Sequence, residues 1–362
     1  MGSAATTTWA CRLKALVAAG LIGGLALATI LVLSRGVGTI WHSATVLGLK
    51  GFGVVVGFHI VLIVLMGCAW WMLARGRADA KLPRFIWGRL IRDSAAEALP
   101  LSQIGGFVLG ARALALTGVS GAFAAASTVV DVTLELVAQI GYTIIGLLLL
   151  EWLRPGNEIV GPVLAGVVIM SVVAAIFFAI QARGAGFVER SSKRLASQFL
   201  GRDIGEAGAV QVGIRDLQAR RSTLLLAAST HLVSWLLSGA ETWVTFKLMG
   251  LAVALPAALA IDSMIYGMRS AAFMVPNALG VQEGGLVLLG LVFGVGPDAS
   301  LALSLIKRAR DLVIGIPALL VWQAIEGRHA WRGGAAAHGS SALFVASVVP
   351  RHTGTDASPR PQ

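Results

Sequence analysis

Acidic side chains lie inside several apolar runs of this 362-residue chain, where an ionised group is costly and usually functional. Asp131 and Glu135 are four residues apart, so both carboxylates lie on one face of a predicted helix. Two like charges on one face repel each other unless a cation or a proton compensates them. This pair therefore predicts a functional site in which the two negative charges are balanced.

Further ionisable residues occur in the later apolar segments. Asp262 and Arg269 are seven residues apart and share a helix face, while Glu283 lies in a glycine-rich stretch. A basic group around Lys307 separates two apolar runs. Arginines engage polar or anionic ligand heads, and carboxylates balance those charges or carry protons. We predict a substrate-binding site formed by Arg112, Asp131, Glu135, Glu283, Arg308, Arg310 and Asp311.

Structural roles are the alternatives for these residues. The basic group at 307–310 would cap a helix at a membrane interface, and Asp262 with Arg269 would form an ion pair between packed helices. Arg112 would extend its guanidinium to the membrane surface. Three further residues are interpreted mainly as packing residues, namely Glu241, His231 and His59.

Two apolar stretches, 98–118 and 278–296, are short and rich in glycine, and each opens near a proline. Aligning Pro100 with Pro276 also aligns Glu135 with Asp311, which suggests an internal repeat. Irregular backbone at membrane depth is tolerated where it lines a cavity or is buried in protein. The predicted motif residues of these stretches are Pro100, Gln103, Gly105, Gly106, Pro276, Gly280, Gln282 and Gly284.

Composition indicates the environment of these residues. Hydrophobic residues make up 56% of the chain and charged residues 13%, whereas an average soluble domain has about 25% charged residues. The net charge of +11 comes mainly from connecting loops, so we expect contacts with lipid head groups and no nucleic-acid partner. Cys11 and Cys68 lie at or in apolar runs, and we expect neither a disulfide nor a metal site.

A membrane-crossing helix needs about 20 apolar residues. The expected fold is all-α, a polytopic integral membrane protein with seven or eight transmembrane helices and one or two short re-entrant or broken segments. Residues 1–325 would form a single transmembrane domain, followed by a disordered polar tail at 326–362. Spans are predicted near 13–33, 52–73, 121–150, 158–182, 223–246, 252–275 and 300–323.

The distribution of basic residues predicts the orientation. Loops 74–96 and 183–222 carry an excess of Lys and Arg and are expected on the cytoplasmic side. The segment 151–158 has one Arg against two Glu and is expected outside. This alternation predicts a cytoplasmic N-terminus.

The sequence resembles a known family in three places. These are the stretch Pro276 to Gly284, the stretch Leu99 to Gly106, and the later run Lys307 to Asp311. Over residues 10–325 the chain resembles the flippase-like membrane region of lysylphosphatidylglycerol synthases. Within that family it is most similar to the hopanoid-biosynthesis-associated membrane proteins, on the stretch Leu99 to Gln103 followed by Gly110 to Ala113.

The resemblance implies a multi-pass protein of the bacterial cytoplasmic (inner) membrane that moves or sequesters hopanoid or glycerolipid. Its implied partners are membrane lipids and lipid-biosynthesis enzymes, and no oligomeric state follows. Full synthases carry a soluble aminoacyl-transfer domain after the membrane part, whereas a short polar tail follows here. Synthase activity is therefore not expected.

The sequence is compatible with three classes of function. A lipid translocator or lipid-handling protein is favoured, with no cofactor and no catalytic residues. An intramembrane lipid-modifying enzyme is the first alternative, although no His-Glu-x-x-His motif or phosphate-binding Gly-x4-Gly-Lys loop is present. The second alternative is a scaffold of a lipid-synthesis complex, for which removal of the charges at Asp131 and Glu135 would leave function intact.

Overall fold

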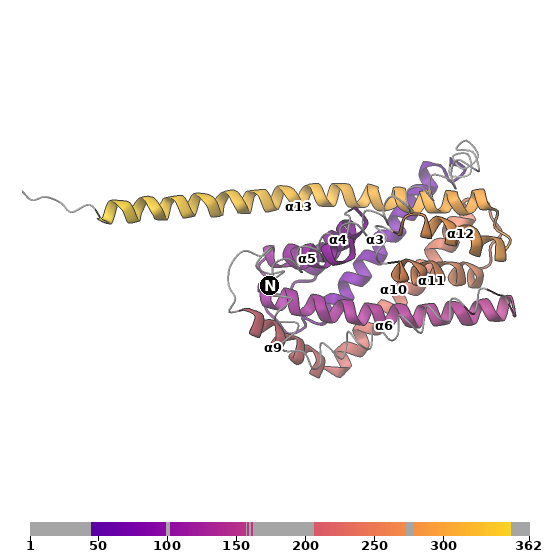
Figure 1. Cartoon of the computed structure of the whole chain (residues 1–362), viewed down its shortest axis with the longest axis horizontal. Coiled ribbons are helices and arrows are strands. Elements are labelled where there is room, and N and C mark those ends of the chain that lie inside the picture. The colour runs from indigo at the N-terminus through magenta and orange to yellow at the C-terminus, as the bar shows by residue number, and fades with distance from the viewer. Residues whose placement is uncertain are drawn as a thin grey trace, which may run out of the picture. The chain divides into compact units, whose positions relative to one another are not determined.

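Helices make up all the regular elements of the described part of the chain (Figure 1). The computed structural model describes residues 45–98, 102–156, 206–272 and 278–348, with the single positions 158 and 161. The predicted span at 13–33 lies outside the described residues, as does 158–182 apart from those two positions. The helices are α3 (Gly48–Met72), α4 (Leu82–Ala98), α5 (Ser102–Leu116), α6 (Gly121–Leu153), α9 (Glu206–Ala219), α10 (Arg221–Leu248), α11 (Leu255–Ala271), α12 (Val281–Val292) and α13 (Pro297–Val348).

Three of the described helices are long and apolar enough to cross a membrane, namely α3, α6 and α10. They confirm an all-helical membrane protein, and α5 and α12 supply two shorter apolar helices. Many large apolar side chains remain exposed on these helices, including Val54 on α3 and Leu148 on α6. A bilayer is the environment in which such surfaces are stable.

The same sequence of long and short helices occurs twice along the described part of the chain. In α3 to α6 the helices contain 25, 17, 15 and 33 residues, and in α10 to α13 they contain 28, 17, 12 and 52. In each set a long helix is followed by two short helices and a second long helix. This order agrees with the repeat that the sequence suggests, and we refer to α3–α6 and α10–α13 as the two halves.

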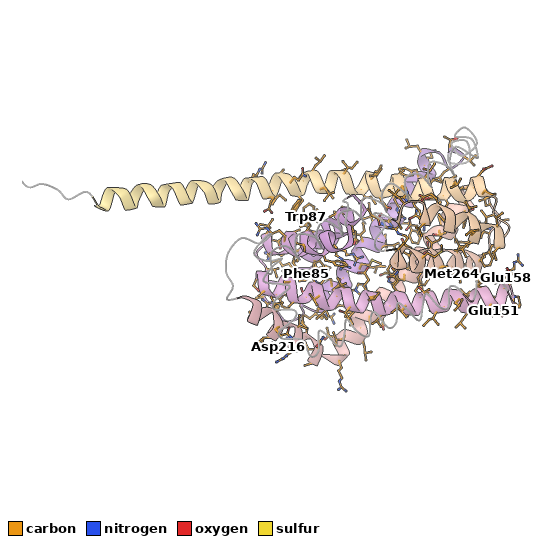
Figure 2. The ribbon with its side chains drawn as sticks, viewed as in Figure 1. Phe85, Trp87, Glu151, Glu158, Asp216 and Met264 are labelled. Carbon is orange, nitrogen blue, oxygen red and sulfur yellow. The ribbon has the colours of Figure 1, made fainter. Side chains whose placement is uncertain are left out.

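Two large apolar cores hold the described helices together, and a smaller one lies around Tyr142 and Trp235. In one, Trp70 of α3 packs edge-on against Phe85 of α4 at 5.6 Å between ring centroids, and its indole N–H donates to Ser127 of α6. The other gathers α6, α10, α11, α12 and α13 around Met264 and Leu286. Figure 2 shows the labelled side chains of Phe85 and Met264 among these helices.

The reversal between α3 and α4 is fixed by polar contacts. Arg77 donates two hydrogen bonds to Asp79, at 3.0 and 2.8 Å, and this lowers the pKa of the Asp79 carboxyl. Arg84 donates to the carbonyl of Asp79, and Trp71 donates to that of Ala80. These bonds hold the start of α4, which carries the buried arginines Arg89 and Arg92.

The structure corrects the expected loop at 74–96, because residues 82–98 form α4 and two of its arginines are buried. Within the other expected loop, 183–205 lies outside the described residues and 206–219 forms α9. A hydropathy pattern misses α4 because it counts each arginine as water-facing, whether or not a carboxylate pairs with it.

The chain divides into two compact units, residues 1–319 and 320–362. The first contains α3 to α12 and the beginning of α13. Composition predicts a disordered tail from residue 326, whereas the helix continues to Val348. Between Pro317 and Pro350 the sequence contains no proline that would break it, and it ends two residues before Pro350. Residues 349–362 lie outside the described residues.

Candidate functional site: two buried ionic clusters and an apolar pocket

The predicted carboxylates of α6 are balanced by arginines of α4. Arg89 forms two parallel bonds to Glu135, at 2.9 and 2.8 Å, and its Nε donates to Asp93 at 2.7 Å. Arg92 lies one turn further along α4 and donates to Asp131 at 2.7 Å and also to Glu135. The prediction that Asp131 and Glu135 share a face with compensating charge nearby is consistent with this geometry.

A histidine from the other half completes this group. His231 on α10 is fully buried, and its Nε2 lies 2.9 Å from Asp131 Oδ1. A carboxylate oxygen has no proton to give, so Nε2–H is the donor. We call this group the first ionic cluster; its members are Arg89, Arg92, Asp93, Asp131, Glu135 and His231.

Burial makes the balance of charge in this cluster important. Arg89 and Arg92 are each 4% exposed, and Asp131 is fully buried. Removing one partner from a buried ion pair leaves an uncompensated charge, which costs about 3–5 kcal/mol. The cluster therefore fixes α4 against α6 more firmly than surface ion pairs would.

Close packing of α5 on α4 positions Arg92. Gly106 and Gly110 are four residues apart on α5, and a Cβ at Gly106 would lie 2.6 Å from the Arg92 carbonyl oxygen. A Cβ at Gly110 would lie 2.7 Å from the Arg92 Cβ. Glycine is required at both positions because the backbones approach closely, as in other small-residue helix contacts.

We expect Gly106→Ala to lower stability by about 1–3 kcal/mol, because the new methyl group would push α5 away from Arg92. Gly105→Ala is the matched control. A Cβ there meets nothing within 4 Å, and alanine favours a helix over glycine. The thermal unfolding midpoint in detergent should fall for Gly106→Ala and stay level or rise for Gly105→Ala. Equal midpoints for the two variants would contradict the close packing.

A second group of buried charges lies around α13. Lys307 donates to Asp262 of α11 at 2.5 Å, and Arg310 donates to Glu241 of α10 and to Asp311. His59 of α3 lies 3.1 Å from Glu241 through Nδ1 and 3.9 Å from Asp311 through Nε2. We call this the second ionic cluster; its members are His59, Glu241, Asp262, Lys307, Arg310 and Asp311.

Asp262 is the most heavily bonded acceptor in this cluster. Besides Lys307, its two oxygens accept hydrogen bonds from Tyr142 at 3.1 Å, Ser238 at 3.0 Å and Thr242 at 2.6 Å. Three helices therefore meet α11 at one carboxylate that is 1% exposed. The expected ion pair between Asp262 and Arg269 does not form, since Arg269 donates to Glu97 and Gln282 instead.

Glu283 has a structural role at the start of α12 and also binds an arginine. Its Oε2 accepts the backbone N–H of Gly280 at 2.8 Å, where the φ of +77° favours glycine. Its Oε1 accepts hydrogen bonds from Ser304 and Arg308. The Nη2 of Arg308 is buried and has no hydrogen-bond partner. Arg308 is therefore a donor with unused capacity.

The structure brings four predicted site residues into the two clusters, Asp131 and Glu135 in the first and Arg310 and Asp311 in the second. Two more, Glu283 and Arg308, form a separate ion pair. Arg112 lies half-buried on α5. Lys307 and Arg310 are buried mid-helix, so they do not cap a helix at an interface. Sequence reasoning placed Arg89 and Arg92 in a loop and gave His59, His231 and Glu241 packing roles.

The structure describes some of the remaining predicted motif residues and not others. Pro100 and Pro276 lie outside the described residues, and Gln103 lies in α5 without a described side chain. Gln282 donates to Ser304 at 3.0 Å, which ties α12 to α13. A Cβ at Gly284 would meet nothing within 4 Å, so packing gives no reason for glycine there.

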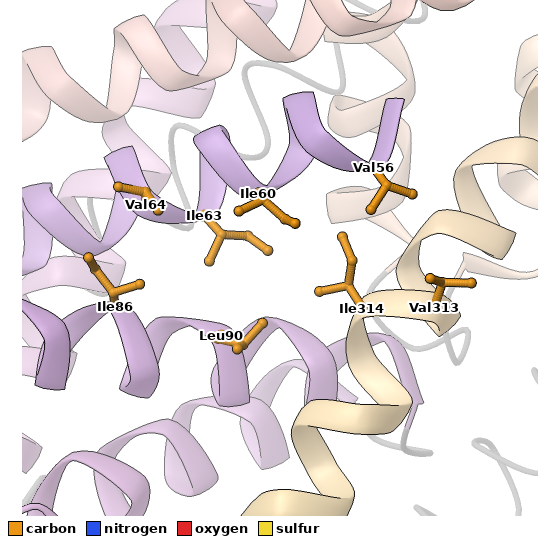
Figure 3. A pocket seen from close by; sticks show the side chains of 8 residues that line it. All are labelled: Val56, Ile60, Ile63, Val64, Ile86, Leu90, Val313 and Ile314. Carbon is orange, nitrogen blue, oxygen red and sulfur yellow. The ribbon is translucent and has the colours of Figure 1, made fainter. Parts of the chain in front are cut away.

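An apolar pocket of about 330 Å³ lies between α3, α4 and α13 (Figure 3). Its walls are aliphatic throughout. Ile60 is 47% exposed and Val313 is 52% exposed, so the pocket borders the apolar outer surface of these helices. The lining residues are Val56, Ile60, Ile63, Val64, Ile86, Leu90, Val313 and Ile314.

The comparisons with known proteins agree with a membrane setting. A family model described as the lysylphosphatidylglycerol synthase TM region matches residues 13–318, which is most of the chain and includes both clusters and the pocket. Comparison with curated proteins gave no match, and neither did comparison with solved structures. The chain belongs to the family of lysylphosphatidylglycerol synthase TM regions, which indicates a multi-pass membrane protein with a lipid-related function.

Proposed function

We propose that this protein is a membrane lipid translocator or lipid-handling protein whose cargo is an amphiphile with an aliphatic body. The observation that carries the proposal is the apolar pocket beside the second ionic cluster. Such a juxtaposition suits a molecule with one apolar and one polar end. Family membership supports a lipid as that molecule.

The pocket favours an aliphatic occupant that enters from the bilayer. Its eight lining side chains are Val, Ile or Leu, so they offer no hydrogen bond to a polar solute. Ile60 and Val313 are half-exposed on helices whose outer surface is apolar. Burial of hydrocarbon there gains about 0.8 kcal/mol per CH₂ relative to water, but a lipid tail in the bilayer is already apolar. The pocket therefore distinguishes lipids by the shape of their apolar part, because burial of hydrocarbon there gains little over burial in the bilayer.

The helices place the ionic cluster one turn from the pocket. His59 is three residues after Val56 and four before Ile63, so they share a face of α3. On α13, Ile314 is four residues after Arg310. Pro317 has no backbone N–H, which leaves the Val313 carbonyl without its usual helical donor. Polar groups are thus available where the head of a bound amphiphile would lie.

The three arginines predicted to engage a lipid head differ in their capacity. Arg310 is 3% exposed and is held by Glu241 and Asp311, so it balances charge within the protein. Arg308 keeps an unpartnered Nη2 and is the better donor to an anionic head. We propose Arg308 for this role, and Arg112 remains a predicted contributor.

The pairing of the carboxylates supports transport rather than catalysis. Within the described residues, the carboxylates of both clusters bind arginine, lysine or histidine and so balance charge within the protein. We therefore propose a non-enzymatic protein that moves or holds lipid without changing its covalent structure.

The finer features of the proposal follow the sequence and the resemblance. We propose hopanoid or glycerolipid as cargo, seven or eight transmembrane helices, a bacterial inner-membrane location with a cytoplasmic N-terminus, and lipid-biosynthesis enzymes as partners. Figure 2 shows Glu151 and Glu158 at one end of α6 and Asp216 toward the other. Glu151 and Glu158 belong to segment 151–158, which has more acidic than basic residues, and Asp216 belongs to segment 183–222, which has more basic than acidic residues.

Filling the pocket should reduce lipid binding. We expect Ile60→Trp to lower the amount of lipid that co-purifies in mild detergent at least severalfold, because the indole would occupy the space of the tail. Val61→Trp is the matched control, since Val61 is the neighbouring β-branched residue of α3, is 53% exposed and does not line the pocket. Lipid quantified by mass spectrometry should stay at the wild-type level in this control. Equal lipid in both variants and the wild type would overturn the pocket as the binding site.

A further inference from the structure

The two ionic clusters have the same charge composition. Each contains two permanent cations and three carboxylates, so each carries one net negative charge when its histidine is neutral. In the first cluster the cations are Arg89 and Arg92, and in the second they are Lys307 and Arg310. A net charge inside a membrane protein is expensive. One proton on each histidine would neutralise both clusters.

Each histidine reaches its cluster from the opposite half of the chain. His59 belongs to α3 in the first half and contacts Glu241 and Asp311 in the second. His231 belongs to α10 in the second half and contacts Asp131 in the first. The crossed contacts mean that the charge on these histidines affects how strongly the two halves hold each other.

Both imidazoles have a nitrogen that can accept a proton. His231 donates Nε2–H to Asp131, so in the neutral ring Nδ1 carries a lone pair, and that atom is buried without a partner. His59 donates Nδ1–H to Glu241, which leaves the lone pair on Nε2, 3.9 Å from Asp311. A proton added to either lone pair gives an imidazolium and breaks no other bond.

Each histidine lies among charged side chains of other helices. His231 faces Asp131 and Glu135 from α6, with Arg92 and Arg89 of α4 behind those carboxylates. His59 faces Glu241 from α10 and the neighbouring pair Arg310 and Asp311 from α13, with Lys307 within electrostatic range of Glu241. In both places a carboxylate lies within hydrogen-bonding distance of the imidazole.

We propose that His59 and His231 are the proton-binding groups of two matched sites, and that their protonation couples lipid movement to a proton gradient. Protonation strengthens the contacts between the halves, and deprotonation weakens them. A proton gradient would therefore favour one arrangement of the halves when the histidines face the acidic side and another when they face the basic side. The coupling rests on the proposed lipid movement, whereas proton binding at the two histidines does not.

Proton binding is tested first, on purified full-length protein in detergent. After a jump from pH 8 to pH 5.5, uptake reported by a pH-sensitive dye should be lower in the double variant His59→Gln/His231→Gln than in the wild type by two protons per chain. Should the glutamines impair folding, His59→Lys supplies a fixed positive charge in place of the titrating ring and should lower uptake by one proton. Uptake equal to the wild type in folded variants would overturn the proposal.

Coupling is tested with fluorescent glycerolipid in vesicles that hold the protein. Under an imposed pH gradient, label should accumulate in one leaflet for the wild type and for the control His329→Gln, which changes no member of either cluster, and should equalise when a protonophore is added. The double variant should show no accumulation. Lipid movement that ignores the gradient would refute coupling and leave the translocator standing. No lipid movement with normal proton uptake would refute the proposed function and the coupling, while proton binding would stand.

Discussion

Arg92→Met is expected to destabilise the protein by about 3–5 kcal/mol, because it leaves Asp131 and Glu135 buried with one cation instead of two. Methionine keeps most of the side-chain volume, so the effect reports the charge rather than a cavity. The unfolding midpoint in detergent measures it. The result also tests whether α4 is fixed by the buried cluster.

Two further variants make this result specific. Arg77→Met is the matched control, since Arg77 pairs with Asp79 in an exposed turn, where ion pairs contribute at most about 1 kcal/mol. The double variant Arg92→Met/Asp131→Asn should recover part of the lost stability, because it removes the unpaired charge along with its former partner. Equal losses for Arg77→Met and Arg92→Met would contradict the burial of the first cluster.

Asp262→Leu is the second change with a large expected effect, again about 3–5 kcal/mol. It leaves the Lys307 ammonium without a carboxylate and removes the acceptor of three hydroxyl groups from α6 and α10. Asp216→Asn, at an exposed carboxylate of α9, is the control and should change stability by less than about 0.5 kcal/mol. Chemical unfolding followed by tryptophan fluorescence measures both.

The partner substitution separates charge from packing. Lys307→Met alone should also destabilise, because Asp262 would then keep its charge with hydroxyl donors only. The combination Asp262→Leu/Lys307→Met removes both charges and should lose much less stability than the sum of the two single losses. Additive losses in the combination would show that the pair does not interact.

The sequence predicted the carboxylate side of the first cluster but not its cationic side. Asp131 and Glu135 stand out because two acids at helical spacing in an apolar run are costly and seldom occur without a specific role. Arg89 and Arg92 do not stand out, because a charged helix such as α4 has the composition of a loop until its partners are known. Only the fold shows that the arginines of α4 reach the carboxylates of α6.

The second cluster shows that spacing within one helix does not identify the partner of a charged residue. The spacing of Asp262 and Arg269 suggested a pair on one helix, but helical neighbours share a face without having to bind each other. Their partners, Lys307 and Glu97, come from other helices. His59 and His231 are each single histidines in apolar spans, so a pattern in one helix cannot reveal that each completes a cluster in the opposite half.

Glycines were predicted as motif residues, and the structure separates their roles. Gly106 is required by the approach of α5 to the backbone at Arg92, and Gly280 by its positive φ at the start of α12. Gly105 and Gly284 face open space. Sequence alone gives all four the same weight, because it contains no information on what lies beside each Cα.

We propose that this protein moves lipid between the two leaflets of the membrane. The most direct measurement uses vesicles with fluorescent lipid in both leaflets and an impermeant quencher added outside. With purified wild-type protein we predict that nearly all the fluorescence is lost, because inner-leaflet lipid reaches the quencher, whereas protein-free vesicles lose only the outer-leaflet signal. Loss limited to the outer-leaflet signal in the protein-containing vesicles would contradict the claim.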